Sequence, residues 1–342
     1  MESTLKFLGF TLDAEQPHMS GERFLMMKDK SVLVATDEKG RKVIVKIADI
    51  PGGQKEIEHE KQTRDLLKSM VFANDKILFP TETYFGKKNG YLIWATEFVP
   101  QEKVYVAHTL EEQFFLILKA LEEQEAFHAT TFEHLKSVDG FFPVYTTQTY
   151  LKKFEEFKKK VSTHNDKNII ETLEKAEQFL VANKKTLNKY VNYLTHTDFV
   201  PHNFRVRDKS IYMLDLSAVH FGNKYEGWAR FLNYMVIHNP KLEKFLADYV
   251  RENRGEEEYF CLRLMRVYKL GFLLDFYVRS LNKTEGNLKE LTLERIDFWH
   301  QILKYILNDE KIPENFVEEY KKKRDDLRSE DEKKRQREFA IA

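Results

Sequence analysis

The sequence predicts an α+β protein with two lobes: a small N-terminal lobe over residues 1–99, made of an antiparallel sheet and one helix, and a large, mainly helical lobe over residues 100–342. The first reason is length, because 342 residues exceed what one ordinary compact core accommodates. The second is patterning, since short β-branched runs separated by turn signals occupy the first hundred residues. After Pro100 the apolar residues instead recur with the period of a helix.

The small lobe is predicted to contain strands on both sides of one helix. Asp37-Glu38-Lys39-Gly40 is typical of a turn, and Lys88-Asn89-Gly90 is typical of a hairpin connection. Gly52 and Gly53 are predicted to break the chain before a polar, Glu-rich helix over Lys55–Met70. The predicted strands are Arg23–Met27, Ser31–Thr36, Lys42–Ala48, Ile77–Phe85 and Tyr91–Phe98.

The large lobe opens with a capping box, Thr109 with Glu112, ahead of a helix that is expected to run to about His128. Asn239 before Pro240 is a second helix-start signal. A highly charged helix or tail is expected after Pro313. The other predicted helices are Thr149–Val161, Lys167–Asn183, Tyr225–Ile237, Lys241–Glu252, Glu256–Leu281 and Leu293–Leu307.

Composition excludes some classes of function. The 55 basic and 55 acidic side chains cancel, whereas nucleic-acid-binding proteins usually carry a basic excess, so no nucleic-acid partner is expected. No apolar run reaches the ~18 residues that cross a bilayer, and no secretory leader is recognisable. The single Cys261 cannot form an internal disulfide and is expected to be a buried thiol. We therefore expect a cytoplasmic protein without a membrane partner; the oligomeric state is left open.

The segment His196-Thr197-Asp198-Phe199-Val200-Pro201-His202-Asn203, followed by a hydrophobic run that ends on Asp215, carries the chemistry. Asp198 is a candidate to orient an acceptor hydroxyl and accept its proton. Asn203 and Asp215 offer an amide oxygen and a carboxylate, both suited to Mg²⁺. A predicted hairpin, with its turn at Asp208-Lys209-Ser210, is expected to bring Asn203 and Asp215 side by side. His196 is interpreted as a residue that braces the loop.

Lys46 closes the most β-branched strand, and a lysine that faces inward there needs a partner because a buried unpaired ammonium is costly. Glu60 on the following helix is the preferred partner and Glu56, one turn earlier, is its rival. The paired ammonium would then face the phosphates of a nucleotide. The alternative is that all three are surface charges. Glu97-Phe98-Val99 ends the last strand of the small lobe, where the backbone of Glu97 and Val99 is expected to bind the adenine edge. The alternative is that this segment is an ordinary exit from a strand into a loop.

These residues resemble the aminoglycoside phosphotransferase and choline kinase group, which are small-molecule kinases with the protein-kinase fold. That group carries His-Gly-Asp-Leu-His-Pro-x-Asn and then a hydrophobic strand ending in Ile-Asp; here the strand ends Met213-Leu214-Asp215. The resemblance implies that Asp198 is the catalytic aspartate, that Asn203 and Asp215 are magnesium ligands, and that Lys46 contacts the nucleotide phosphates.

Some positions depart from the group's pattern. Thr197 replaces a glycine, Val200 replaces a common histidine, and the turn at residues 28–31, where a nucleotide-covering loop is expected, has no glycine. Glu226 stands near the place of an aspartate that begins a helix in the group. These changes leave a second hypothesis open, a nucleotide-binding regulator without turnover. A protein kinase is a third and is less favoured, because no Ala-Pro-Glu segment follows Asp215.

The leading prediction is a phosphotransferase that uses ATP and Mg²⁺ to phosphorylate a hydroxyl of a small molecule: an aminoglycoside, amino alcohol, sugar or related metabolite. The choice between ATP and GTP is left open. Carboxylates together with aromatic residues would suit a cationic acceptor; the alternative is that the aromatic residues belong to the core. The candidate acceptor residues are Tyr225, Glu226, Trp228, Arg230, Asp275, Tyr277, Asp297 and Trp299.

Overall fold

A computed structural model describes residues 1–16, 29–69, 78–138, 141–164 and 166–334, without the side chains of residues 126–138. The predicted strand at Arg23–Met27 lies outside the described residues. The chain divides into two compact units. The sheet unit comprises Met1–His108, Pro201–Ala218 and Glu330–Ala342, and the helical unit comprises Thr109–Val200 and Val219–Ser329.

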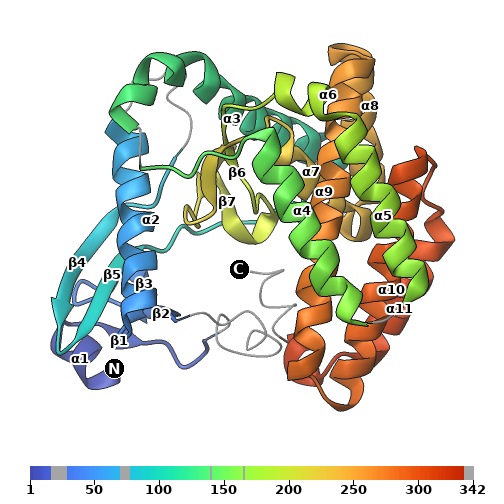
Figure 1. Cartoon of the computed structure of the whole chain (residues 1–342). Helices are drawn as coiled ribbons and strands as arrows, with labels where there is room; N and C mark the ends of the chain where they lie inside the picture. The colour runs from blue at the N-terminus through green and yellow to red at the C-terminus, as the bar shows by residue number, and fades with distance from the viewer. Residues whose placement is uncertain (17–28, 70–77, 139–140, 165, 335–342) are drawn as a thin grey trace. The chain divides into compact units, whose positions relative to one another are not determined.

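The sheet unit is built on a five-stranded antiparallel sheet in the order β1-β2-β3-β5-β4 (Figure 1). The strands β2 (Ser31–Thr36) and β3 (Lys42–Ala48) have the predicted bounds, and β5 spans Tyr91–Glu97. The strand β4 (Glu82–Lys88) begins and ends later than predicted. The short β1 (Thr11–Leu12) and the helix α1 (Glu2–Phe7) had no sequence prediction.

The helix α2 (Pro51–Ser69) packs on β3 and β5 and starts four residues earlier than predicted. Gly52 and Gly53 therefore lie inside its first turn and do not break the chain. Pro51 explains this start, because its fixed φ suits the first position of a helix. A Cβ on Gly53 would overlap the backbone of Asp29, so glycine is what lets the start of α2 approach that turn.

The two faces of the sheet bury different residues. Val43, Val45 and Ile47 of β3 join Leu5, Ile93 and Ala95 in one core cluster. Ala48 and Trp94 pack with Ile57 of α2 in another cluster. Side chains alternate between faces along a strand, so Lys46 lies on the face that α2 covers.

The predicted hairpin forms between β7 (Phe204–Arg207) and β8 (Ser210–Met213), and it belongs to the sheet unit. Asp208 and Lys209 have φ of 52° and 59°, as a two-residue type I′ turn requires. The 3₁₀ turn η4 (Pro201–Asn203) precedes it, and η2 (Tyr105–Ala107) packs Tyr105 edge-on against Phe204. The Met213 N–H donates to the Leu78 carbonyl at 3.0 Å, which joins the hairpin to the N-terminal part of the chain.

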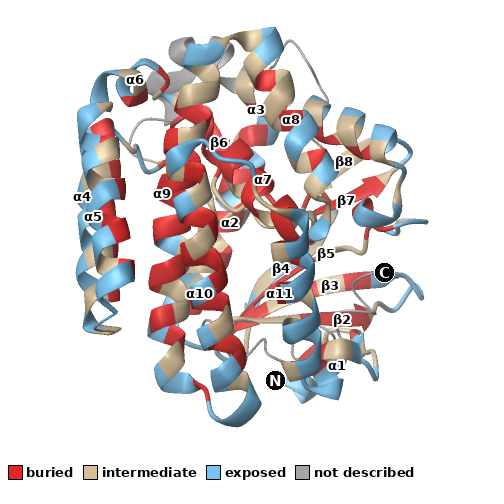
Figure 2. Cartoon of the chain, turned by 90° about the vertical axis from the view of Figure 1, so that its right-hand side faces the viewer, coloured by how far each residue is buried: buried red, intermediate tan, exposed pale blue. Residues whose placement is uncertain are grey.

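The helical unit is organised around α9 (Glu256–Ser280), which packs against α4 (Thr147–Val161), α7 (Glu226–His238), α8 (Pro240–Arg254) and α10 (Gly286–Asn308). Much of α9 is coloured as buried in Figure 2. Cys261 on α9 is fully buried, as predicted, and burial raises the pKa of its thiol to about 12. The remaining helices are α3 (Leu110–Val138), η3 (Ser162–His164), α5 (Lys167–Ala182), α6 (Lys184–Lys189), η5 (Leu281–Lys283) and α11 (Glu314–Leu327).

Both predicted helix starts in this unit are confirmed. The Glu112 N–H donates to Thr109 Oγ1 at 3.2 Å, and the Thr109 N–H donates to Glu112 Oε2 at 3.0 Å. The Leu242 N–H donates to Asn239 Oδ1 at 3.2 Å. A short antiparallel pair, β6 (Tyr193–His196) with β9 (Val219–Gly222), leads into the motif segment. Within the described ranges, none of the helices combines the length and the apolar character that a bilayer span requires.

Candidate active site

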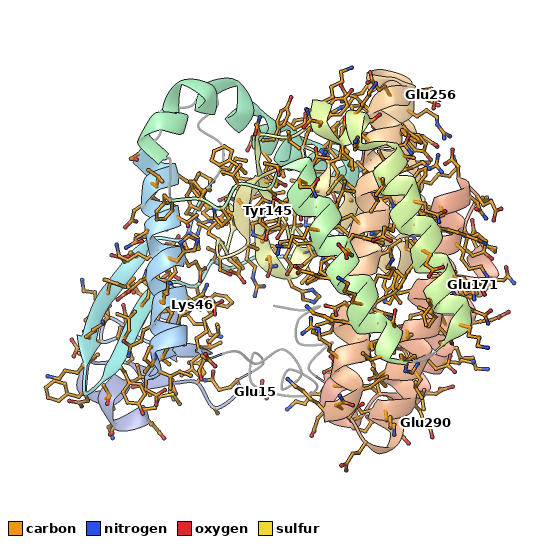
Figure 3. All side chains as sticks on the ribbon, in the orientation of Figure 1. Glu15, Lys46, Tyr145, Glu171, Glu256 and Glu290 are labelled. Carbon is orange, nitrogen blue, oxygen red and sulfur yellow. The ribbon has the colours of Figure 1, made fainter. Side chains whose placement is uncertain are left out.

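Lys46 and Glu60 form an ion pair between β3 and α2. Glu60 is fully buried, and 12% of the Lys46 side chain is exposed. The Lys46 ammonium also lies 5.4 Å from the centre of the Trp94 ring. Figure 3 labels Lys46 beside α2. A fully buried carboxylate needs a counter-ion, and Lys46 supplies it.

Lys30, just before β2, adds a second ammonium to the same cluster. Its Nζ lies 3.0 Å from a Glu56 oxygen and 3.4 Å from a Glu60 oxygen. Burial alone would lower the pKa of Lys30, but the carboxylates of Glu60, Asp215 and Glu56 raise it well above its usual value. Glu56, the rival partner for Lys46, therefore pairs with Lys30.

Sequence reasoning treated the turn before β2 only as a place without glycine and assigned no role to Lys30. One signal for it was present in the sequence. Glu56 and Glu60 are four residues apart, which places both carboxylates on one face of the helix. Two neighbouring carboxylates facing a sheet predict two cations there.

Asp215 is held between two contacts to the Lys46–Glu60 pair. The Lys46 ammonium donates to the Leu214 carbonyl at 3.4 Å, and the Leu216 N–H donates to Glu60 Oε1 at 3.3 Å. Asp215 Oδ1 also accepts from the Ser217 N–H at 3.1 Å and from the Ser217 hydroxyl at 2.7 Å. The carboxylate of Asp215 is thus fixed next to the two lysines within one unit.

Asn203 lies next to this segment, because the Leu214 N–H donates to the Asn203 carbonyl at 3.0 Å. The hairpin β7–β8 closes the chain between them. One amide oxygen and one carboxylate fit Mg²⁺, which in nucleotide sites takes most of its ligands from phosphates and water. No cluster of three or more His, Cys, Asp or Glu side chains suited to a metal occurs among the described residues, so this part of the chain offers no all-protein metal cage.

Glu97 and Val99 lie at the end of β5. The Glu97 N–H donates to the Thr81 carbonyl at 2.8 Å, and the Phe98 N–H donates to the Lys42 carbonyl at 3.0 Å. Neither N–H is therefore available to a base. The Glu97 carbonyl and the Val99 N–H are the remaining groups for the expected adenine contact. Val99 itself is buried.

Asp198 lies in the helical unit, two residues after β6. The Nε of Arg230, on α7, donates to Asp198 Oδ1 at 2.8 Å. Burial would raise the pKa of the Asp198 carboxyl, but Arg230, His196 and Lys269 hold it below its usual value. Asp198 is therefore ionised at neutral pH. Phe199, which is buried and packs against Phe231, anchors the loop that carries it.

A buried ionic network lies on the same helix as Arg230. Glu226 is 2% exposed and accepts from the Tyr150 hydroxyl at 2.6 Å, while Lys269 Nζ donates to it at 3.2 Å. His220 Nε2 lies 3.0 Å from the same carboxylate. Burial opposes ionisation of Glu226, but Lys269, His220 and Tyr150 lower its pKa to about 2.

The aromatic acceptor candidates are mostly core residues. Tyr225, Trp228 and Trp299 are buried. The Trp228 indole N–H donates to Glu125 at 2.8 Å. Among the acidic candidates, Asp275 pairs with Arg279 at 2.9 Å and Asp297 is exposed on α10. Of the candidates, Arg230 contacts Asp198.

Comparison with known proteins shows the fold. No family model and no curated protein sequence matches this chain. Solved structures do match. The GDP complex of aminoglycoside 2'-phosphotransferase-IIIa aligns with a TM-score of 0.63 at 14% identity, over 88% of this chain and 97% of that one. An apo form of a thermostable mutant of aminoglycoside phosphotransferase APH(4)-Ia aligns with a TM-score of 0.61 at 12% identity, over 88% of this chain and 94% of that one.

A macrolide 2'-phosphotransferase of type I aligns with a TM-score of 0.58 at 12% identity, over 85% of this chain and 93% of that one. The APH(4)-Ia enzyme was also solved with ADP and hygromycin B. These likenesses confirm the predicted fold class: a five-stranded antiparallel sheet with a helix, followed by a mainly helical region, as in protein-kinase-like phosphotransferases.

Proposed function

We propose that this chain, whose fold is shared with aminoglycoside and macrolide phosphotransferases, transfers the γ-phosphoryl group of ATP to a hydroxyl of a small molecule with the help of Mg²⁺. The observation that carries the proposal is the network that joins Lys46, Glu60 and the backbone on both sides of Asp215. An isolated ion pair on a strand would be a structural contact. A pair that also positions a candidate metal ligand is the arrangement that phosphoryl transfer requires.

Each residue has a role in this proposal. Lys46, held by Glu60, contacts the nucleotide phosphates, with Lys30 as a second cation in the same cluster. Glu97 and Val99 bind the base through their backbones. Asn203 and Asp215 would hold Mg²⁺, which would supply positive charge to offset that of the phosphates.

Asp198 receives the acceptor in the proposed reaction. The acceptor oxygen forms a bond to the γ-phosphorus, the bond from that phosphorus to the ADP oxygen breaks, and the acceptor proton passes to the Asp198 carboxylate. Because the pKa of Asp198 is lowered, its carboxylate is a weak base, and its main effect is to orient the hydroxyl. A weak base is sufficient because phosphoryl transfer through a loose transition state needs little help from proton removal. Asn203 follows Asp198 by five residues, which keeps their Cα atoms within ~18 Å even in a fully extended chain.

The test is phosphoryl transfer by an Asp198→Asn variant, assayed by ADP release and mass spectrometry across a panel of hydroxyl compounds. We expect a loss of roughly 100-fold or more in turnover, with Mg-ATP affinity retained. Asp208→Asn is the matched control, because Asp208 is exposed at the hairpin turn and Asn tolerates its positive φ. Unchanged turnover in Asp198→Asn would remove that residue from the mechanism. Nucleotide binding without any turnover in the wild-type protein would favour a regulator.

A further inference from the structure

Arg230 is a partly exposed charge in a buried part of the helical unit. Residues 226–233 form the first two turns of α7, and Arg230 is the one residue of these eight that is not buried. Its neighbours Ala229 and Phe231 are fully buried. Because the residues around Arg230 on α7 are buried, the backbone at Arg230 is fixed, and its guanidinium is held next to Asp198.

Most of the hydrogen-bonding capacity of Arg230 is unused. A guanidinium has five N–H donors, and its two terminal nitrogens form a fork that matches the paired oxygens of a carboxylate or phosphate. Within the described chain, Arg230 donates only from Nε, to Asp198. About a quarter of the side chain, 24%, is exposed. The Asp198 contact therefore orients the fork without occupying it.

Two of the three acidic acceptor candidates are buried and paired with cations, and the third, Asp297, is exposed on α10. Glu226, one helical turn before Arg230, is buried and bound by Lys269, His220 and Tyr150. Asp275 is 1% exposed and paired with Arg279. Beside Asp198, the terminal N–H groups of Arg230 offer donors to an anion, whereas both buried candidate carboxylates already have a partner cation.

We infer, on the basis of the proposed phosphotransferase activity, that the acceptor is an alcohol bearing a carboxylate or phosphate group, and that the terminal nitrogens of Arg230 bind this group while Asp198 faces the hydroxyl. This reverses the suggestion from the candidate acceptor residues in the sequence, whose carboxylates and aromatic rings would suit a cationic acceptor. Arg230 is thus assigned as the residue that determines the charge class of the substrate.

The test uses acceptors that share a carbon skeleton and differ in their charged group. Two skeletons, glycerol and glucose, are each presented in neutral, carboxylate, phosphate and ammonium forms: glycerol, glycerate, glycerol phosphate and aminopropanediol, and glucose, glucuronate, glucose phosphate and glucosamine. Turnover is measured with Mg-ATP, and binding is measured separately by calorimetry with a non-hydrolysable ATP analogue. The carboxylate and phosphate arms separate the two sources of the anion.

We expect the wild-type protein to prefer an anionic member of at least one skeleton. Arg230→Gln should then raise KM for the anionic acceptor by roughly 10- to 100-fold, the range expected for a lost charged hydrogen bond. KM for the neutral member should not change. Arg230→Lys should recover part of the preference, because it keeps the charge but not the fork. Lys160→Gln, on the exposed face of α4, is the control for loss of a positive charge.

The outcomes separate this inference from the proposed function. A preference for the ammonium members, or an equal loss for all acceptors in Arg230→Gln, would overturn the inference and leave the phosphotransferase proposal intact. Binding of anionic members that Arg230→Gln loses, without turnover in any assay, would support anion binding by Arg230 and contradict the phosphotransferase proposal. Absence of any preference for anions in both assays would also overturn the inference.

Discussion

Glu226 illustrates how one buried side chain acquires its properties from its neighbours. Burial by itself would keep this carboxyl neutral. The ammonium of Lys269, the His220 ring and the Tyr150 hydroxyl instead stabilise the carboxylate. His220 is in turn stacked on Tyr145, with ring centres 4.0 Å apart, and Tyr145 is labelled in Figure 3. The network joins α4, β9, α7 and α9, so its contribution to stability depends on the charge of Glu226.

This charge should make stability depend on pH in a defined window. The pKa of Glu226 is lowered from 4.5 to about 2, so its contribution is complete above pH 4.5 and is lost as the pH falls toward 2. This difference between the pKa values of the unfolded and folded states corresponds to a contribution of about 3 kcal/mol to the free energy of unfolding. Glu226→Gln should therefore reduce the free energy of unfolding by about that amount at pH 7 and by less than half of it at pH 3, measured by urea denaturation at both values. Glu171→Gln, an exposed glutamate on α5 labelled in Figure 3, is the control. An equal loss at both pH values would contradict this assignment.

At the scale of elements, the contact between α4 and α9 depends on the absence of a side chain. Gly271 lies in the middle of α9, where alanine is intrinsically more favourable by roughly 0.5–1 kcal/mol. A Cβ at this position would overlap the ring of Phe154 on α4. Phe154 is fully buried, so its ring has little room to move. The close approach of the two helices, which places Lys269 beside Tyr150 and Glu226, therefore requires glycine.

Gly271→Ala should destabilise the protein despite its better helix propensity. We expect a loss of roughly 1–3 kcal/mol, because overpacking a tight contact costs more than the propensity gains. The measurement is thermal or chemical denaturation of Gly271→Ala, Phe154→Leu and the double variant. In the Phe154→Leu background, the Gly271→Ala change should be nearly neutral or stabilising, because the smaller side chain leaves room for the methyl group. Additive losses would show that the ring is not the cause.

At the scale of the molecule, the sheet unit is assembled from separated parts of the chain. Residues 201–218 follow almost a hundred residues of the helical unit, yet they cluster with the N-terminal sheet. The contacts that attach them are the Leu78–Met213 backbone bond and the bonds from Lys46 and Glu60 to residues 214 and 216. A ligand that binds Lys46 and Asp215 together would therefore stabilise both parts.

Nucleotide binding should protect these two parts together. With Mg²⁺ and a non-hydrolysable ATP analogue at 100 times its Kd, the free energy of unfolding should rise by about 2.7 kcal/mol. Amide hydrogen exchange should slow in β3 and in residues 204–216 together, while α10 and α11 remain unchanged. Lys46→Met should abolish the effect, and removal of Mg²⁺ should reduce it. Protection restricted to one of the two segments would contradict a shared site.

Local patterns in the sequence determined the elements and the candidate chemistry. The β-branched runs fixed β2 and β3 to the residue, and the capping residues Thr109 and Asn239 fixed two helix starts. These features depend on neighbours within a few residues. The predicted start of α2 was wrong, because Gly52 and Gly53 were interpreted as a break although Pro51 suits the first position of a helix.

The tertiary structure decided how the charges are paired. The sequence supplied Glu56, Glu60, Lys30 and Lys46, but only the packing of α2 on the sheet determined which ammonium meets which carboxylate. The packing of the helical unit likewise pairs the Glu226 carboxylate with Lys269 and places Arg230 against Asp198. Electrostatic energies depend on distance and burial, which residue order does not specify. For that reason the proposed reaction type rests on the motif, whereas the inferred charge of the acceptor rests on contacts that only the fold provides.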